Sequence, residues 1–383
     1  MIKNILFISH DASRSGAPLY LLRLIEWLKN NYSVNCTVLL NVGGELKNEF
    51  ETIGKTYLWN AHFTSSTATE KIASKLGYKK LSVSYQQRII KEIKNIQPDL
   101  IISNTIVSNK LAFLLKQNIN CPFVAIYHEM KFTAQFFYPD YVGNKFIAIF
   151  DKIITVNENI KQFITDDYFF NQKNIFVIPP FISVTKKNNT KKNISADKFN
   201  ILLSGFGGWQ KGFDLLGVLL ANFKYKNIDH KFSFTWLGEV PENNKKMLTF
   251  ELDQIGATDL ISFPGKVTNM QDYYLNASLF LMLSKEDSFP LTCIEAASYG
   301  LPIIAFEKCG GIVEFIEKGA GKCVPFMDIN EIVNQILLFE SDKDYYNDKS
   351  NTAKQLSNEY NISILATKVI NVLLSTGINL QKK

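Results

Sequence analysis

A polar, basic stretch near the middle of the chain separates two series of alternating apolar and amphipathic segments. Residues 185–193, TKKNNTKKN, hold no apolar residue that could anchor them in a core, which predicts a surface linker. Before it, the pattern predicts strands at 4–9, 35–41, 99–104, 123–127, 152–156 and 175–179, and helices at 19–29, 85–96, 107–116 and 159–167. After it, strands are predicted at 200–204, 233–238, 260–263, 279–283, 303–306 and 322–325. Such alternation is typical of doubly wound parallel sheets, so the sequence predicts an α/β protein with two Rossmann-like domains, at residues 1–183 and 194–360.

Length and composition limit the class of protein further. The chain has 383 residues, 46% of them hydrophobic, which is enough for two medium-sized cores. Its five cysteines show no CxxC or Cys/His ligand spacing, which indicates a reducing compartment. No apolar run approaches the ~18 residues of a membrane span. The first residues, MIKNILFISHDAS, predict a strand leading into a loop rather than a signal peptide, so we expect a cytoplasmic protein.

The charge of the chain indicates what kind of partner it binds. A net charge of +6 is mild for this length and suits an anionic small molecule or an anionic lipid surface. Lysine and arginine are scattered, and no basic stripe interleaved with aromatic residues occurs beyond the linker. We therefore expect no nucleic-acid partner.

The segment from 279 to 321 carries the most chemical information. An apolar strand leads into the loop SKEDSFP, the loop into a helix ended by Gly300 and Pro302, and a second strand follows. Ligands of parallel sheets bind at the carboxyl ends of strands, where the N-terminus of such a helix offers N–H groups to a phosphate. Glu295, expected in the first turn of the helix, can accept hydrogen bonds from a ribose. Asp287 on the loop can reach a second polyol.

The spacing of Asp287 and Glu295 resembles the acidic pair of the family 4 retaining glycosyltransferases, which have the GT-B fold. The family usually has Glu where this chain has Asp287; Glu286 is one residue out of register, whereas Phe289 is shared. The resemblance implies that the first acid contacts the donor sugar and Glu295 the ribose. The donor diphosphate would then meet the stretch Phe289, Pro290, Leu291 and Thr292. The ordinary alternative is a solvated loop acid plus a glutamate that complements the helix dipole.

A glycine loop follows the first strand after the linker. It runs from Gly205 through Phe206 to Lys211 and Gly212, ahead of a predicted helix, and predicts a phosphate site covered by a mobile cation. The spacing fits neither the Rossmann GxGxxG pattern nor the P-loop. It resembles the family's loop, in which the Lys neutralises the donor diphosphate, although Phe206 replaces an Arg that many members carry. A surface lysine beside a tight turn is the alternative.

Two segments of the first half end strands with polar residues. The loop HDASRSGAP after the first strand contains Gly16, and it resembles the family's first loop, whose glycine lies beside the donor phosphates. His128 and Glu129 end another strand, and Asn104 follows the third. The resemblance places His128 near the donor sugar and diphosphate, as a hydrogen-bond donor to charge that develops on the leaving group. The aromatic stretch 131–139 lines the acceptor site, touches lipid headgroups, or packs as the core of a short helix.

Three weaker signals complete the sequence pattern. Gly310 and Gly311, followed by Glu314, fit the family's late glycine segment near the sugar, and Val267 lies where members hold the base by main-chain contacts. Asp342 and Asp344 have the Asp-x-Asp spacing that proteins of a different fold use to bind the metal ion of a sugar nucleotide. Because this pair lies in a charged helical stretch, we interpret it as a solvated face and expect no metal and no cofactor.

The resemblance that these motifs carry implies transfer of a sugar from a nucleotide diphosphate donor, UDP-sugar favoured, with retained configuration. The acceptor would be a glycan or lipid-linked sugar in bacterial surface polysaccharide synthesis, with possible contact to the inner face of the membrane. Catalysis would depend on His128, Asp287, Lys211 and Glu295. The GT-B fold places two domains across a cleft and returns a C-terminal helix, predicted here at 363–374, so that residues 361–383 pack on the first domain. A sugar-nucleotide binding protein without turnover and an epimerase of the same fold are the alternatives.

Overall fold

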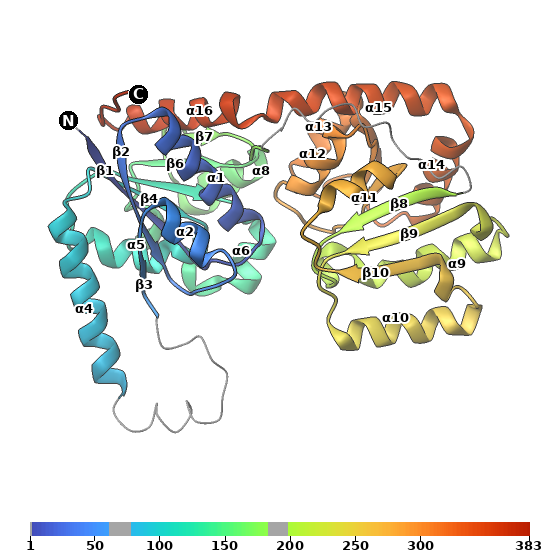
Figure 1. Cartoon of the computed structure of the whole chain (residues 1–383), viewed down its shortest axis with the longest axis horizontal. Helices are drawn as coiled ribbons and strands as arrows, with labels where there is room; N and C mark the ends of the chain where they lie inside the picture. The colour runs from blue at the N-terminus through green and yellow to red at the C-terminus, as the bar shows by residue number, and fades with distance from the viewer. Residues whose placement is uncertain (1, 61–77, 183–197) are drawn as a thin grey trace. The chain divides into compact units, whose positions relative to one another are not determined.

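The computed structural model describes residues 2–60, 78–182 and 198–383 of the chain, so the predicted linker at 185–193 lies outside the described residues. The chain divides into two compact units (Figure 1). Unit 1 consists of Met1–Phe181 together with Ile362–Lys383, and unit 2 of Ile182–Asn361. Each unit contains a parallel sheet with helices between its strands, as the alternating pattern predicts.

The sheet of unit 1 has seven strands in the order β3-β2-β1-β4-β5-β6-β7. Its central strands β4 and β5 are buried along their whole length, because helices cover both faces. The strands are β1 (Lys3–Ser9), β2 (Val34–Leu40), β3 (Lys55–Leu58), β4 (Leu100–Asn104), β5 (Phe123–Tyr127), β6 (Lys152–Thr155) and β7 (Ile175–Val177). The helices are α1 (Gly16–Asn31), α2 (Lys47–Ile53), α4 (Tyr78–Ile96), α5 (Asn109–Lys116), α6 (Lys131–Phe137), α7 (Asn144–Ile147) and α8 (Glu158–Tyr168).

The C-terminal segment belongs to unit 1. Helix α16 (Ile362–Leu374) packs against α1 and buries one apolar face, as its amphipathic pattern predicts (Figure 1). The residues after it pair with the end of α1: Tyr32 forms an antiparallel bridge with Lys382, and the Ser33 N–H donates to the Gln381 carbonyl at 2.8 Å. Residues 381–383 are therefore fixed to the segment at the C-terminal end of α1.

The sheet of unit 2 has six strands in the order β10-β9-β8-β11-β12-β13. The strands are β8 (Phe199–Ser204), β9 (Phe232–Leu237), β10 (Ile261–Gly265), β11 (Leu279–Met282), β12 (Ile303–Phe306) and β13 (Gly321–Val324). The helices are α9 (Leu216–Tyr225), α10 (Glu242–Ile255), α11 (Met270–Asn276), α12 (Leu291–Ser298), α13 (Ile312–Phe315), α14 (Ile329–Ser341) and α15 (Lys343–Ser357). Because β8 and β11 are neighbours, the loops that follow them meet at one edge of the sheet.

The structure adds one strand that the sequence pattern does not predict. β3 has the sequence KTYL and lies at the edge of its sheet, where its side chains are exposed or half-buried. A strand that buries neither face shows no apolar run, and this is why the pattern misses it.

The Asp342–Asp344 spacing has a structural role. The Asp342 carboxylate accepts hydrogen bonds from the N–H groups of Asp344 and Tyr345, at 3.1 and 2.9 Å, and so caps α15. Over residues 2–60, 78–182 and 198–383, no set of three or more His, Cys, Asp and Glu side chains is close enough to hold a metal ion. Within the same ranges, no helix has the length and apolar character required to cross a bilayer.

Candidate active site

The glycine loop after β8 folds around the side chain of Lys211. Gly205 has φ +149°, and a Cβ atom there would lie 3.1 Å from Cγ of Lys211. Gly212 has φ +73°, and its Cβ would lie 2.1 Å from the Leu283 carbonyl oxygen. A side chain at position 212 would therefore collide with the end of β11. The glycines let the loop bring Lys211 against the neighbouring strand.

Lys211 forms an ion pair with Asp287 at the carboxyl edge of the sheet. Asp287 is only 9% exposed, whereas the adjacent Glu286 is half-buried, so Asp287 is the acid turned toward the glycine loop. Its main chain is held too, because the Asp287 N–H donates to the Cys309 carbonyl at 2.7 Å. Gly310 lies directly opposite, where a Cβ would be 1.6 Å from the Asp287 carbonyl oxygen. The position of Asp287 beside Lys211 thus depends on a glycine at position 310, which no other residue can replace without movement of the backbone.

Helix α12 begins at Leu291, after Pro290, so Glu295 is its fifth residue. The expectation that Glu295 lies in the first turn is therefore wrong, and its carboxylate projects from the second turn. The Tyr274 hydroxyl donates a hydrogen bond to Oε2 of Glu295 at 3.3 Å. Leu291 and Thr292 form the first turn, where backbone N–H groups have no acceptor within the helix.

The other residues predicted for the donor site differ from one another in burial and in their contacts. The Phe289 side chain is buried against the Tyr360 ring, with centroids 5.4 Å apart, so it can offer a ligand only its main chain. The N–H of Gly311 donates a hydrogen bond to the Ser288 carbonyl at 2.9 Å, and so holds the loop that carries Asp287. Glu314 instead lies on the surface and pairs with Lys318 at 2.8 Å. Val267 is half-buried just after β10.

A buried lysine that no sequence motif singles out connects the glycine loop to the loop that carries Asp287. The Lys285 side chain is 5% exposed, forms an ion pair with Asp214, and places Nζ 4.8 Å from the Trp209 ring centroid. Its N–H donates to the Gln210 carbonyl at 2.9 Å. Lys285 therefore fastens the glycine loop to the loop that carries Asp287. Its position two residues before Asp287 is the only sequence signal for it.

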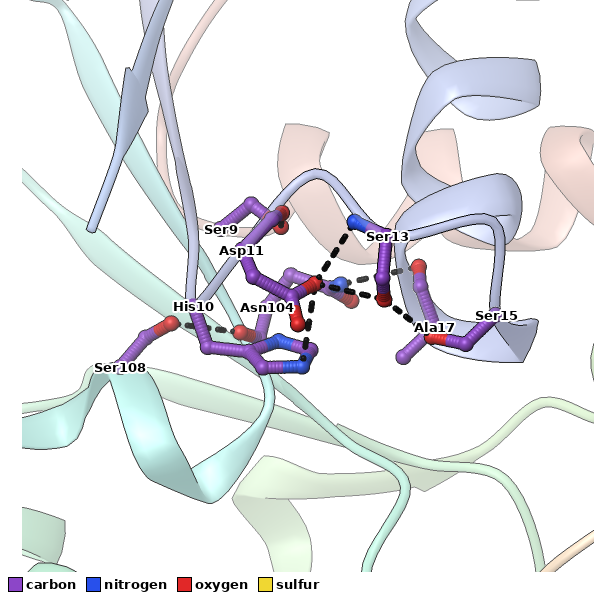
Figure 2. Close-up of polar contacts among 8 residues, drawn as sticks. All are labelled: Ser9, His10, Asp11, Ser13, Ser15, Ala17, Asn104 and Ser108. Atoms are coloured by element: carbon purple, nitrogen blue, oxygen red, sulfur yellow. Dashed lines mark hydrogen bonds and ion pairs between the residues drawn. The ribbon is translucent and has the colours of Figure 1, made fainter. Parts of the chain in front are cut away.

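In unit 1, the loop after β1 is organised by Asp11 (Figure 2). Its Oδ1 accepts hydrogen bonds from the N–H and the hydroxyl of Ser13, at 3.1 and 2.9 Å, and lies 3.4 Å from Nε2 of His10. Burial lowers the pKa of His10, and the Asp11 carboxylate partly opposes this. Gly16 is the first residue of α1, and a Cβ there would meet no atom within 4 Å. The protein's own packing therefore does not require glycine at position 16.

The ends of β4 and β5 bring Asn104 and His128 together. Nε2 of His128 lies 2.8 Å from Oδ1 of Asn104, and the Tyr20 ring meets the imidazole edge-on at 5.1 Å. Burial, with a smaller effect of the nearby His10, lowers the pKa of His128 to about 3. The ring is therefore neutral near pH 7.

Glu129 ties the same two strand ends together. Its Oε2 accepts hydrogen bonds from the N–H groups of Ile106 and His128, at 3.0 and 3.2 Å. Burial raises the pKa of its carboxyl to about 7, against the opposing effect of these N–H groups. Thr105, which lies between the end of β4 and Ile106, has φ +76°, a strained conformation for a β-branched residue and one that is typical of functional sites. In the described part of the chain, Nδ1 of His10 and Oγ1 of Thr105 are buried without a hydrogen-bond partner.

The aromatic stretch after Glu129 forms helix α6. Its Phe132, Phe136 and Phe137 are 44%, 66% and 50% exposed, and their rings contact one another, with the Phe132 and Phe136 rings stacked at 5.2 Å. Of the interpretations for this stretch, core packing is therefore wrong for these three rings. They form an exposed aromatic surface on unit 1.

Comparison with known proteins places this architecture in a family. The model described as Glycosyltransferase Family 4 matches residues 15–186, and that described as Glycosyl transferases group 1 matches residues 184–356. Curated relatives include an uncharacterized glycosyltransferase of Haemophilus influenzae, 28% identical over 57% of this chain, and the amylovoran biosynthesis glycosyltransferase AmsD of Erwinia amylovora, 27% identical over 50%. The aligned part spans 60% and 53% of the length of these relatives.

Solved structures show the same fold over nearly the whole chain. HepE of Anabaena, in complex with UDP and glucose, matches with a TM-score of 0.78 and 17% identity, covering 97% of this chain and 100% of that one. Sucrose-phosphate synthase of Thermosynechococcus elongatus matches with a TM-score of 0.75 and 16% identity, covering 97% and 98%. The chain, with its two parallel sheets and the helices between their strands, thus has the GT-B fold. Since the two family models together run from residue 15 to residue 356, the chain belongs to the GT-B glycosyltransferases of group 1 and family 4.

Proposed function

We propose that the protein transfers a sugar from a UDP-sugar to a hydroxyl group of a glycan or lipid-linked acceptor, with retention of the anomeric configuration. The observation that carries this proposal is the cluster at the carboxyl edge of the second sheet. There Lys211 pairs with Asp287. Helix α12 begins four residues after Asp287 and carries Glu295. The complex of HepE with UDP and glucose supports the choice of donor.

The chemistry of the cluster follows from charge. Lys211 and the N–H groups of Leu291 and Thr292 would receive the negative charge of the diphosphate as it leaves. Asp287 would hold hydroxyls of the sugar, and Glu295 those of the ribose. The bond between the anomeric carbon and the phosphate oxygen breaks, the acceptor oxygen bonds to the same face, and its proton passes to the leaving diphosphate. The protein would supply positioning and electrostatic stabilisation.

The acceptor class is proposed from the relatives. AmsD is named for amylovoran biosynthesis, and a further relative, from Klebsiella pneumoniae, is named for the cps region. We propose that the acceptor is an intermediate of a surface polysaccharide, used at the cytoplasmic face of the membrane. The exposed phenylalanine rings of α6 are the surface we assign to contact with a lipid-linked acceptor or its membrane.

A panel of sugar nucleotides tests the donor assignment. A bound donor stabilises the folded state according to its occupancy, so UDP-sugars should raise the melting temperature more than GDP- or ADP-sugars do. Slow release of free sugar from the stabilising donor would indicate a transferase. Stabilisation without any release or transfer would favour a binding protein instead.

Replacing Glu295 by glutamine is expected to weaken donor binding and leave the fold unchanged. The isosteric amide removes a charge-assisted acceptor worth about 1.5–3 kcal/mol, which corresponds to roughly 10- to 150-fold in the dissociation constant. Titration calorimetry with UDP would measure the loss. The control is Glu314→Gln, because Glu314 lies on the surface of the same unit. Equal affinity of the Glu295 variant and the native protein would remove Glu295 from the site.

A further inference from the structure

We infer that Asn104 is a positioning residue that holds His128 in the neutral form with its proton on Nε2, so that Nδ1 accepts a hydrogen bond from a substrate hydroxyl. The inference rests on the proposed function only for the identity of that hydroxyl. The hydrogen bonding of Asn104 and His128 in the ligand-free protein carries the rest.

The orientation of the Asn104 amide is fixed on both sides. Asn104 is fully buried, and its Nδ2 donates to the Ala17 carbonyl at 3.0 Å (Figure 2). The opposite orientation would place Oδ1 against this carbonyl, acceptor against acceptor. The Asn104 carbonyl accepts from the Ser108 hydroxyl at 2.7 Å, which also holds its main chain. Oδ1 must therefore be the atom that faces His128.

The protonation of His128 follows from that orientation. Oδ1 can only accept, so Nε2, 2.8 Å away, must carry a proton. A second proton on Nδ1 is opposed by burial and by the neighbouring His10, which together lower the pKa of His128 to about 3. The carboxyl of the adjacent Glu129 is directed at the main chain, because its Oε2 accepts hydrogen bonds from the N–H groups of Ile106 and His128. Nδ1 therefore carries a lone pair.

This arrangement changes the role that the resemblance implies for His128. A lone pair at Nδ1 attracts a hydroxyl and repels the oxygen atoms of a phosphate. His128 is therefore suited to hold a sugar hydroxyl rather than to donate to the leaving diphosphate. The Asn104 amide also fastens this ring to the start of α1, through Ala17. One buried amide thus sets both the tautomer and the place of the imidazole.

The ligand-free native protein provides the first test. The chain has four histidines, so ¹⁵N-histidine labelling gives four resolvable side chains, and the His128→Gln variant identifies the signals of His128. We expect these signals to show a protonated Nε2 and an unprotonated Nδ1, unchanged from pH 5 to pH 8. Titration near the ordinary histidine pKa, or a proton on Nδ1, would overturn the inference.

The Asn104→Asp variant provides the second test. A carboxylate against Nε2 stabilises the imidazolium, so we expect His128 to titrate at least two pH units higher than in the native protein. Asn109→Asp is the matched control, because Asn109 is an equally buried amide that accepts from the Tyr127 hydroxyl at 3.0 Å. If His128 responds no more to Asn104→Asp than to Asn109→Asp, the positioning role is wrong. If the first variant does not fold, the native spectrum alone decides.

These outcomes are separate from those of the proposed function. The spectra are recorded without substrate and do not depend on turnover. A neutral, Nε2-protonated His128 in a protein that neither binds nor cleaves any sugar nucleotide would leave the Asn104 assignment intact and overturn the glycosyl transfer. The reverse result would overturn only the role of Asn104.

Discussion

Replacing Lys211 by alanine is expected to lower turnover by about 10²- to 10³-fold, in the range found when one preorganised stabiliser of developing charge is removed. The loss has two parts. The diphosphate loses its cation, and Asp287, which is buried beside Lys211, keeps its negative charge at the place where the phosphates arrive. Binding of uridine, which has no phosphate, should change little.

The comparison of variants separates charge from structural damage. The double variant Lys211→Ala with Asp287→Asn removes the unpaired carboxylate, so it should bind UDP more tightly than Lys211→Ala alone while it stays inactive. Lys246→Ala is the control, because Lys246 is an exposed lysine on α10 that pairs with Glu242 at 3.5 Å. Uridine affinity that falls as much as UDP affinity would show that the loop has collapsed and would contradict the phosphate role.

The fold follows from the sequence where burial leaves a pattern. β4 and β5 lie in the middle of their sheet and read as short apolar runs, so their positions can be predicted within a residue. β3 lies at an edge, and its exposed residues show no pattern. The expectation that Glu295 lies in the first turn of α12 is wrong because the sequence does not mark the first residue of that helix. Pro290 precedes the helix, and no capping side chain marks its beginning.

The site was predictable only where its residues form local motifs. Lys211 and Asp287 lie on two loops and Glu295 on the helix after the second loop, and the motifs that contain them carry the family resemblance. Their supporting residues come from elsewhere in the chain. Tyr274 lies 21 residues before Glu295, and Lys285 lies 71 residues from Asp214. Contacts of this kind are made by the tertiary fold, so no local pattern predicts them.

The pairing of Asn104 with His128 shows the same limit in unit 1. The two residues lie 24 positions apart and meet because β4 and β5 are neighbours in the sheet. The sequence could place both residues at strand ends but could not give the orientation of the amide. The direction of the hydrogen bond to His128 therefore needed the structure.

Glu129→Gln is expected to stabilise unit 1 relative to the native protein, by an amount that grows with pH to about 3 kcal/mol. Burial raises the folded-state pKa of Glu129 to about 7 from an ordinary 4.5, so the stability linked to this acid is complete below pH 4.5 and is lost as the pH rises to 7. A shift of about 2.5 units corresponds to about 3 kcal/mol. Glutamine does not titrate, and its oxygen can still accept from the Ile106 and His128 N–H groups.

His128 also affects how the stability of unit 1 depends on pH. Its pKa is about 3 in the folded protein and 6.5 ordinarily, so its neutral form contributes stability that is lost as the pH falls from 6.5 to 3. Between pH 4.5 and 6.5, the folded state holds one proton on Glu129 and the unfolded state holds one on His128. The two contributions to the pH slope cancel in the native protein. In Glu129→Gln only the His128 contribution remains, and stability should rise by about 1.4 kcal/mol per pH unit in this window.

Hydrogen exchange in β5 measures this difference in the unit that carries both groups. The intrinsic dependence of exchange on pH cancels when the variant and the native protein are compared at each pH. Glu158→Gln is the control, because Glu158 is exposed at the start of α8. Protection of β5 that stays equal in the variant and the native protein from pH 4.5 to 7 would contradict the prediction. It would mean that Glu129 is ionised in the folded protein, and that the Ile106 and His128 N–H groups offset the cost of its burial.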